Sequence, residues 1–307
     1  MTSPDPPVYP TLPSALQDLN LHEPYTRRPV AGGDINQTSV LEDSRGTRLF
    51  LKEHPTADID HFSSEFDGLW ALGQVLSILP RGVACPRPLA LGTQGQEGSF
   101  LLLEYIESGR GPRSGDWLRV GVQLGEFYRA SADQTPATYG YHRSNRIGST
   151  VQINTPEDQW GVFFARHRID YMRRLLATKK RISADVDTGL QRLISRLPEI
   201  LPSTPLRVLV HGDLWRGNVM FDTDGRAVLI DPGVYWGTVE ADLAMAELFG
   251  GFPGDFYSGV AQVTGQSPVP QNREVYRLYH LLNHLLLFGS GYLGGVQETL
   301  RSISNFS

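Results

Sequence analysis

The chain has 307 residues, 40% of them hydrophobic, so it can bury a full core and, at about 100–200 residues per domain, suggests two lobes. A formal net charge of -5 with scattered basic residues gives no footprint for nucleic acid or an anionic membrane, and neither partner is expected. No run approaches the roughly 18 apolar residues of a spanning helix, and no leader pattern is seen. Cys85 is the only cysteine, so no internal disulfide is expected and a cytoplasmic location is the default expectation.

The first third of the chain predicts a small lobe rich in strands. Residues 1–20 are proline-rich and are expected to be a flexible lead-in, and residues 21–106 are expected to form the lobe itself. A turn at Gly32 and Gly33 precedes alternating residues and an apolar strand that Lys52 closes. Backbone amides of such a turn can approach phosphates.

One long helix is expected in this lobe, at 60–79, with an apolar stripe along one face. Glu65 falls within the stripe rather than opposite it. Because a carboxylate on a buried face is costly unless a cation meets it, Lys52 on the preceding strand is its expected partner.

Residues 107–116 are expected to be a hinge, and residues 117–307 a larger, mainly helical lobe. Its apolar periodicity predicts helices at 117–132, 159–177, 184–197, 241–249 and 272–288. Within it, a short strand, a loop and a hairpin turning at Asp224-Gly225 are expected. The order of elements predicts an α+β chain of two lobes.

The loop and hairpin carry the residues that point to chemistry. HGDLWRGN places Asp213 and Asn218 five residues apart, and the next strand delivers Asp231. Phosphoryl transfer needs a carboxylate to accept the hydroxyl proton, oxygen ligands for magnesium and a cation on the nucleotide phosphates. Asp213 is the expected base, and Asn218 and Asp231 are the expected ligands of Mg²⁺. Lys52, paired with Glu65, is expected to hold the phosphates. The ordered set predicts an ATP-dependent kinase with a two-lobed, protein-kinase-like fold.

Each of these residues also has a purely structural explanation. Lys52 and Glu65 can form an ion pair that serves stability alone, and Asp213 and Asp231 can be turn-forming residues beside Gly and Pro. The GGDIN segment matches neither common phosphate-loop pattern and can be a plain hairpin turn. His211 is expected to order the loop by hydrogen bonding rather than to act as a base. The kinase interpretation depends on the order of the whole set.

The sequence closely resembles the fructosamine kinases, also called ketosamine-3-kinases, within the aminoglycoside phosphotransferase and choline kinase group. The segments that carry the resemblance span most of the chain and are GGDIN, FLKE, FLLLEYI, FFARHRI, HGDLWRGN, IDPGVYWG, EADLAMAELFGGFP and LLNHLLLFG. The resemblance implies ATP as donor, with adenine held by the hinge backbone at Glu104, Tyr105 and Ile106.

The resemblance also implies the reaction, which is transfer of the γ-phosphate to the 3-hydroxyl of a ketosamine of the fructosamine or ribulosamine type, free or on a glycated protein lysine. Trp215 is expected to be either an apolar wall for the sugar or its amine, or a core residue that anchors the loop. His284 and Arg168 are expected to line the acceptor pocket. Arg216 stands where relatives usually have Ser and adds a cation beside Asp213.

Other departures from the family concern the acceptor and assembly. Tyr128 and Leu287 stand where relatives often have His. Asp34 stands where some relatives have Cys, so a disulfide dimer through that turn is not expected, and the chain is expected to be a monomer or weak dimer. A kinase acting on an aminoglycoside, choline or homoserine would use the same machinery, and that alternative stays open. A non-catalytic nucleotide-binding pseudokinase would lack a catalytic residue, and none is missing here.

Overall fold

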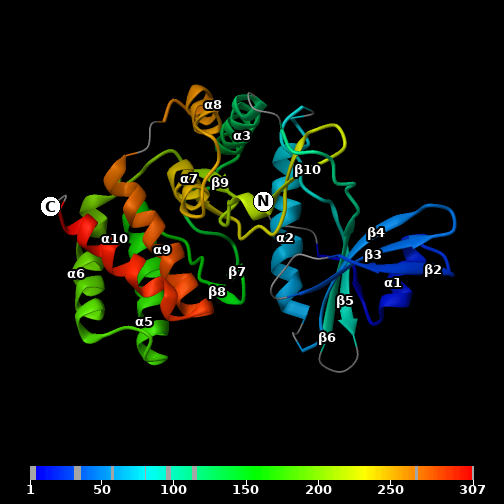
Figure 1. Ribbon diagram of the computed structural model, residues 1–307, viewed down its shortest axis with the longest axis horizontal. Coiled ribbons are helices and arrows are strands. Elements are labelled where there is room, and N and C mark those ends of the chain that lie inside the picture. The colour runs from blue at the N-terminus through cyan, green and yellow to red at the C-terminus, as the bar shows by residue number, and fades with distance from the viewer. Residues whose placement is uncertain are drawn as a thin grey trace. The chain divides into compact units, whose positions relative to one another are not determined.

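The structure, a computed structural model, describes residues 5–30, 36–56, 59–79, 81–94, 98–112, 116–266 and 269–305 (Figure 1). The chain divides into two compact units. The first consists of Met1–Pro112 and Val219–Pro232, and the second of Arg113–Asn218 and Gly233–Ser307.

The first unit contains a six-stranded sheet in the order β1-β5-β6-β4-β3-β2. Strand β1 pairs with β5 in parallel, and all other neighbours are antiparallel. The strands are β1 (Val8–Tyr9), β2 (Tyr25–Pro29), β3 (Gln37–Asp43), β4 (Arg48–His54), β5 (Pro88–Gln94) and β6 (Gly98–Glu104).

A helix and a hydrophobic core lie on each face of this sheet. On one face, helix α1 (Leu12–Asp18) packs with alternate strand residues in a core made of Ala15, Leu16, Leu21, Leu41, Leu49, Leu51, Ala90, Phe100 and Leu102. On the other, helix α2 (Ile59–Leu76) packs in a core made of Phe62, Phe66, Leu69, Leu91, Leu101 and Leu103. Because side chains alternate along a strand, Leu51 faces α1 and Lys52 faces α2.

The N-terminal segment differs from the expected flexible lead-in. Residues 8–9 form strand β1 and residues 12–18 form helix α1. Thr11 caps this helix, since its side chain accepts a hydrogen bond from the Ser14 N–H, and Ala15 and Leu16 are buried. The prolines that suggested disorder instead flank these elements, one of them in the first turn of α1.

A hairpin from late in the chain also belongs to the first unit, although the sequence-based division placed it in the second lobe. Its strands are β10 (Val219–Phe221) and β11 (Ala227–Leu229). Val228 forms a bridge to Ala84, and the Arg226 guanidinium donates to the Gly82 carbonyl at 2.7 Å. These contacts explain the grouping.

The second unit is mainly helical. Its helices are α3 (Asp116–Ala132), α4 (Trp160–Phe164), the π-helical segment η1 (Ala165–Asp170), α5 (Tyr171–Thr178), α6 (Ala184–Ile200), α7 (Val239–Leu248), α8 (Gly254–Thr264), α9 (Pro270–Phe288) and α10 (Leu293–Asn305), with 3-10 turns η2 (Arg216–Asn218) and η3 (Ser290–Tyr292). Two short strand pairs complete it, β7 (Asn145–Ile147) with β8 (Thr150–Gln152) and β9 (Val208–Val210) with β12 (Tyr235–Gly237).

All five helices predicted in this region are present, and the one predicted at 159–177 is interrupted by η1. Helices α8 and α10 were not predicted. Helix α8 packs closely on α3 because both carry glycine, and a Cβ atom at Gly121 would lie 2.0 Å from the Phe256 carbonyl oxygen. A prediction based on the spacing of apolar side chains does not detect a contact made through glycine backbone atoms.

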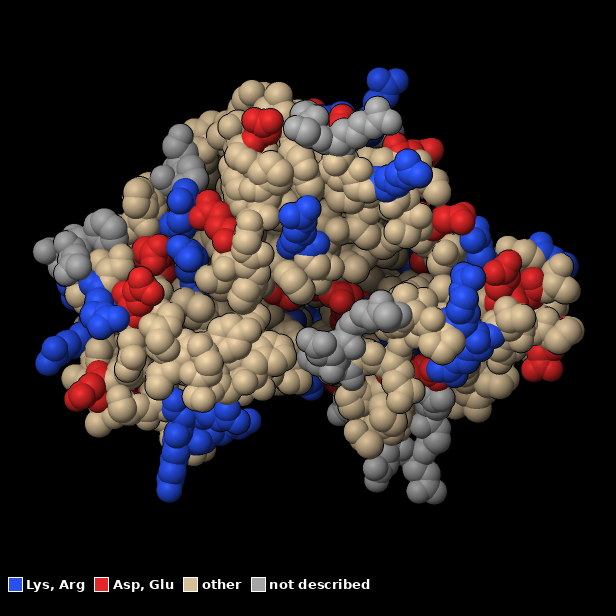
Figure 2. Space-filling view, viewed as in Figure 1, with Lys and Arg blue, Asp and Glu red and all other residues tan. Residues whose placement is uncertain are grey.

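None of the helices in the described ranges is both long and apolar enough to cross a membrane. On the face drawn in Figure 2, acidic and basic side chains are interspersed among neutral ones over most of the surface.

Candidate active site

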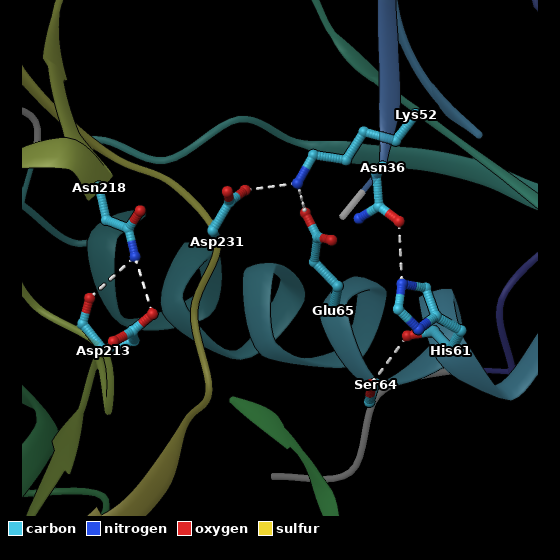
Figure 3. Close-up of polar contacts among 8 residues, drawn as sticks. All are labelled: Asn36, Lys52, His61, Ser64, Glu65, Asp213, Asn218 and Asp231. Atoms are coloured by element: carbon cyan, nitrogen blue, oxygen red, sulfur yellow. Dashed lines mark hydrogen bonds and ion pairs between the residues drawn. The ribbon is translucent and has the colours of Figure 1, made fainter. Parts of the chain in front are cut away.

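The first unit holds a buried cation between two carboxylates (Figure 3). Lys52 extends from β4 toward α2, where its Nζ atom donates to Glu65 Oε1 at 2.6 Å. The same Nζ donates to Asp231 Oδ1, which follows strand β11. The expected pairing of Lys52 with Glu65 is therefore confirmed, and Asp231 joins it.

The cluster is electrostatically unbalanced, because one cation serves two carboxylates. Burial would lower the pKa of Lys52, but the charges of Asp231 and Glu65 outweigh burial and raise it above the ordinary value, so Lys52 stays charged. Burial, aided by the Asp231 charge, raises the pKa of Glu65 while Lys52 opposes it. The Lys52 and Glu65 side chains are 8% and 14% exposed, but that of Asp231 is 44% exposed, so Asp231 is the carboxylate that an incoming cation can reach.

The backbone at Asp231 is unusual. Its φ angle is +54°, in the left-handed region, which non-glycine residues seldom adopt and which Asp tolerates better than most. Backbone outliers of this kind cost of order 1–3 kcal/mol and cluster at functional sites. The conformation directs the Asp231 side chain to Lys52, and the two observations together favour a functional role for this side chain.

The second unit presents Asp213 on a short loop after strand β9. The Asn218 side-chain nitrogen donates to the Asp213 carbonyl at 2.9 Å and to Asp213 Oδ2 at 3.1 Å (Figure 3). The Asp213 N–H donates to His211 Nδ1 at 3.3 Å. His211 is fully buried and thus orders the loop, as expected from the sequence.

This loop is also held by a buried carboxylate that was not predicted from the sequence. Asp242, in α7, accepts the backbone N–H groups of His211 at 2.6 Å and Gly212 at 2.7 Å. It also accepts the Tyr128 hydroxyl at 3.0 Å. Asp242 lies in the quoted EADLAMAELFGGFP segment, but nothing in the sequence shows that its carboxylate turns toward residues about 30 positions earlier. The available signal was an acidic residue between apolar neighbours, Ala241 and Leu243.

Burial raises the pKa of Asp242 to about 6, against the lowering effect of its three hydrogen bonds. Gly212 itself has φ +83°, and a Cβ atom there would lie 2.1 Å from the Gly233 carbonyl oxygen, so only glycine fits. The turn before Asp213 is therefore fixed by both backbone sterics and a buried carboxylate.

Aromatic residues gather beside this loop. The Trp215 ring lies over Gly217, where a Cβ atom would be 2.3 Å from the indole, and it meets Phe249 edge to face at 6.1 Å. Phe249 in turn lies 4.5 Å from the His284 ring. His284 also neighbours Phe288, which is 53% exposed. Trp215 thus anchors the loop and, being 36% exposed, also offers a surface. Phe249 was not predicted as part of this group.

Two further residues expected at the acceptor site lie differently. Arg168, in η1, is fully buried, and it donates to the Ile153 carbonyl at 2.6 Å and to Asn154 Oδ1 at 2.7 Å. It lines no exposed surface, which corrects the expectation. Arg216 is exposed, with its guanidinium 6.0 Å from the Trp117 ring centroid.

The nucleotide-binding residues expected from the sequence are described only in part. Gly32 and Gly33, with Asp34, lie outside the described residues. Asn36, at the end of the GGDIN segment, is described, and its Oδ1 lies 3.1 Å from His61 Nε2 of α2 (Figure 3). Glu104 ends β6 and its N–H donates to the Arg87 carbonyl at 2.9 Å. Adenine would therefore not receive a hydrogen bond from that N–H, and Tyr105 and Ile106 would have to supply the donor.

Oxygen atoms that could bind a divalent cation are available on Asn218 and Asp231, although they are not part of a dense acidic cluster. Within the described ranges, no group of three or more His, Cys, Asp or Glu side chains is arranged to hold a metal. Asn218 turns its amide nitrogen to Asp213, so its oxygen points away from that residue (Figure 3). Mg²⁺ commonly takes only one or two protein carboxylates and completes its shell with phosphates and waters. Asn218 and Asp231 each carry an oxygen atom of the kind that such a cation takes.

Comparison with known proteins supports the same chemistry. The fructosamine kinase family model matches residues 14–305. The chain belongs to the fructosamine kinase family. A probable ketoamine kinase from Synechocystis sp. is 38% identical over 90% of this chain and 89% of that protein. A chloroplastic protein-ribulosamine 3-kinase from Oryza sativa subsp. indica is 36% identical over 86% of this chain and 74% of that protein.

The crystal structure of a candidate fructosamine-3-kinase from Thermobifida fusca has a TM-score of 0.79 and 26% identity, over 91% of this chain and 93% of that one. Membership of the family makes this chain a phosphotransferase and confirms the two-lobed, protein-kinase-like α+β fold. It also implies use of ATP with a divalent cation.

Proposed function

We propose that this chain is a magnesium- and ATP-dependent kinase that phosphorylates the 3-hydroxyl group of ketosamines. The observation that carries the proposal is the match of the fructosamine kinase family over residues 14–305, which spans both units and every motif residue discussed above. The relatives named for ketoamine and ribulosamine substrates support the acceptor class.

In the proposed reaction the acceptor oxygen bonds to the γ-phosphorus while the bond from that phosphorus to the β,γ-bridging oxygen breaks, and ADP leaves. The Asp213 carboxylate accepts the hydroxyl proton. Two contacts support this role: Asn218 donates to Asp213 Oδ2, and Asp213 donates its N–H to His211. The first contact orients the carboxylate and the second holds the backbone that carries it, and orientation supplies much of the rate in such a step.

Lys52 is proposed to hold the nucleotide phosphates, with Glu65 keeping its ammonium group in place. The 2.6 Å contact between them and the burial of both side chains support this assignment. Asn218 and Asp231 would hold Mg²⁺, which when bound neutralises charge on the phosphates. Gly32 and Gly33 would lie near the phosphates, and backbone groups at Tyr105 and Ile106 near adenine.

Trp215 and His284 are proposed to contact the acceptor, with Phe249 joining them into one aromatic surface. Support comes from the ring contacts between these residues and from the place of Trp215, two positions after Asp213. Burial lowers the pKa of His284, and its Nδ1 lies 2.8 Å from the His280 carbonyl, which requires a proton on Nδ1. Its Nε2 is then an acceptor for a sugar hydroxyl when the ring is neutral.

The product would be chemically unstable. A 3-phosphorylated ketosamine, once enolised, can expel phosphate and then release its amine. The kinase would thereby start deglycation, whether of free ketosamines or of glycated protein lysines.

The test is an acceptor panel with magnesium ATP, in which ADP release and the added phosphate mass on the acceptor are both measured. The panel contains fructose- and ribose-derived ketosamines of a small amine and of lysine, a glycated protein, kanamycin, choline, homoserine and free fructose. We expect a ketosamine to win, because free fructose lacks the amine-borne group that supplies binding energy for alignment. A preference above about tenfold for kanamycin or choline, roughly 1.4 kcal/mol in the transition state, would overturn the proposal.

The control for the panel is Asp213→Asn. It should lower turnover of the best acceptor by about 10²–10⁴-fold, the usual contribution of a general base, and leave nucleotide binding measured by calorimetry nearly unchanged. Turnover at the wild-type rate would show that Asp213 is not the base.

A further inference from the structure

A chain of buried polar side chains lies beneath the segment that follows Asp231 in the sequence. It consists of Asn145 and Gln152 from the β7–β8 hairpin, Asn154 after it, Arg168 of η1 and Tyr279 of α9, all of them at most 4% exposed. Buried polar groups are costly unless each is satisfied, so a connected network of this kind is a specific feature rather than ordinary core packing.

One end of the network is Arg168, whose guanidinium can donate but never accept. Its Nη2 donates to Asn154 Oδ1 at 2.7 Å, which forces the Asn154 amide nitrogen to the other side. That nitrogen donates to Asn145 Oδ1 at 2.9 Å. The Asn145 nitrogen is thereby turned to the Val234 carbonyl, at 2.6 Å.

The other end is Tyr279, whose hydroxyl donates to Gln152 Oε1 at 2.9 Å. This contact turns the Gln152 nitrogen toward the Gly233 carbonyl at 2.9 Å and Asn145 Oδ1 at 2.8 Å. Both ends of the network are donors. They therefore fix the Gln152 and Asn145 amides so that each directs an N–H to a backbone carbonyl, those of the consecutive residues Gly233 and Val234.

These carbonyls belong to the backbone that packs on the loop of Asp213. The Gly233 N–H donates to the His211 carbonyl at 2.9 Å. The Gly233 carbonyl oxygen, which accepts from Gln152, also packs against Gly212, where an added Cβ atom would lie 2.1 Å from it. Any shift of Gly233 therefore moves the backbone next to Asp213.

We propose that this network is a positioning device for phosphoryl transfer, in which Tyr279 and Gln152 act through Gly233 on the loop of Asp213. The proposal assigns Arg168 to the same device rather than to the acceptor. It rests on the proposed role of Asp213, and it makes no use of the identity of the acceptor.

The test compares two tyrosines on the same helix. Tyr279→Phe removes the donor that orients Gln152, whereas Tyr276→Phe removes an equally buried hydroxyl that accepts from Trp160 Nε1 at 2.9 Å and lies outside the network. Each change leaves one buried polar group without its partner, so both should lower the melting temperature by similar amounts.

Two readouts separate positioning from stability. Hydrogen exchange, followed by mass spectrometry on peptides covering 207–237, needs no substrate, and we expect faster exchange at Gly212 and Gly233 in Tyr279→Phe only. Steady-state kinetics with the best acceptor should show kcat lowered about tenfold in Tyr279→Phe, while KM for ATP and for the acceptor stays within about twofold. Gln152→Leu should reproduce both effects.

The outcomes are distinct. Faster exchange together with a lower kcat in Tyr279→Phe, and neither in Tyr276→Phe, supports the proposal. Equal effects in both variants, unchanged exchange in Tyr279→Phe, or faster exchange with unchanged kcat each overturn it. If the panel yields no ketosamine turnover, the exchange experiment still decides whether the network holds the segment, so the failure of the proposed function is recognised separately.

Discussion

Removing the hydroxyl of Tyr128 should raise the pH that the enzyme needs for activity. The reason lies in Asp242, which accepts the backbone N–H groups of His211 and Gly212 as well as the Tyr128 hydroxyl. A carboxylate can accept all three hydrogen bonds, whereas a protonated carboxyl group places its own hydrogen in competition with one donor. The loop before Asp213 is therefore best held when Asp242 is ionised.

The magnitude follows from the pKa of Asp242, which burial raises to about 6. At pH 7 such a group is ionised by about ten to one. A hydrogen bond to a charged group is worth about 1.5–3 kcal/mol, and 1.36 kcal/mol corresponds to one pKa unit. Loss of the Tyr128 hydroxyl should thus move the pKa of Asp242 upward by about 1–2, into the range of about 7–8.

The assay is the pH dependence of kcat between about pH 5.5 and 9 at saturating substrates, where kcat reports groups of the bound complex. The acid limb should lie near pH 6 in the wild type and shift upward in Tyr128→Phe. In Asp242→Asn the limb should disappear, with a lower kcat throughout, because an amide cannot serve three donors. An acid limb that stays in place in both variants would refute the reasoning and would assign that limb to another group.

Stability should respond to pH in the opposite sense. The folded pKa of Asp242 is raised above its unfolded value of 3.8, so its contribution to stability is fully present below about pH 3.8 and is lost as pH rises through about 6. The difference of about 2 between these values corresponds to ~3 kcal/mol. Urea unfolding at pH 4.5 and pH 7 should show this dependence as the difference between the wild type and Asp242→Asn. Equal pH slopes would contradict it.

Three further predictions concern the motif residues. Lys52→Met should abolish ATP use and lower the unfolding free energy by about 3 kcal/mol, because it leaves two buried or half-buried carboxylates without their cation. A variant with the melting temperature and turnover of the wild type would show that the ion pair has no role in either. Asn218→Ala and Asp231→Ala should each raise the magnesium concentration needed for half-maximal rate, and unchanged titrations would count against both as ligands. Arg216→Ser should keep kcat if the exposed guanidinium only faces solvent, whereas a large loss would show that it stabilises phosphate charge.

The sequence pattern predicted the positions of the candidate site residues correctly where strand alternation or the spacing within one loop determines them. Alternation along β4 sends Lys52 to the face covered by α2, and the apolar stripe of α2 brings Glu65 to the same face. Spacing within HGDLWRGN brings Asn218 onto Asp213. In each case the partners lie on neighbouring elements or on one loop, so local geometry restricts them strongly.

Contacts between distant segments could not be predicted in the same way. Asp242 meets the loop after β9 and Tyr128 of α3, and no local periodicity links a carboxylate to a backbone N–H in another part of the chain. Arg168 was expected at the acceptor site from the family resemblance, and no local pattern shows that its guanidinium instead meets the Ile153 carbonyl and Asn154 in the interior. Helix α10 has two glycines in its first turn, which lower helix propensity, and it packs on α9.

The buried charge of Asp242 is explained by the two backbone N–H groups that it accepts. Gly212 turns with φ +83°, and its N–H and that of His211 both point into the protein interior toward α7. An apolar residue at position 242 would leave both N–H groups without a partner, at about 1–3 kcal/mol each. The raised pKa means that burial disfavours the ionised form even with these hydrogen bonds included. An apolar replacement would avoid that cost, but it would leave the N–H groups unsatisfied and release the turn that presents Asp213. One buried carboxylate satisfies both N–H groups at once, which a single apolar or singly accepting side chain at this position could not do.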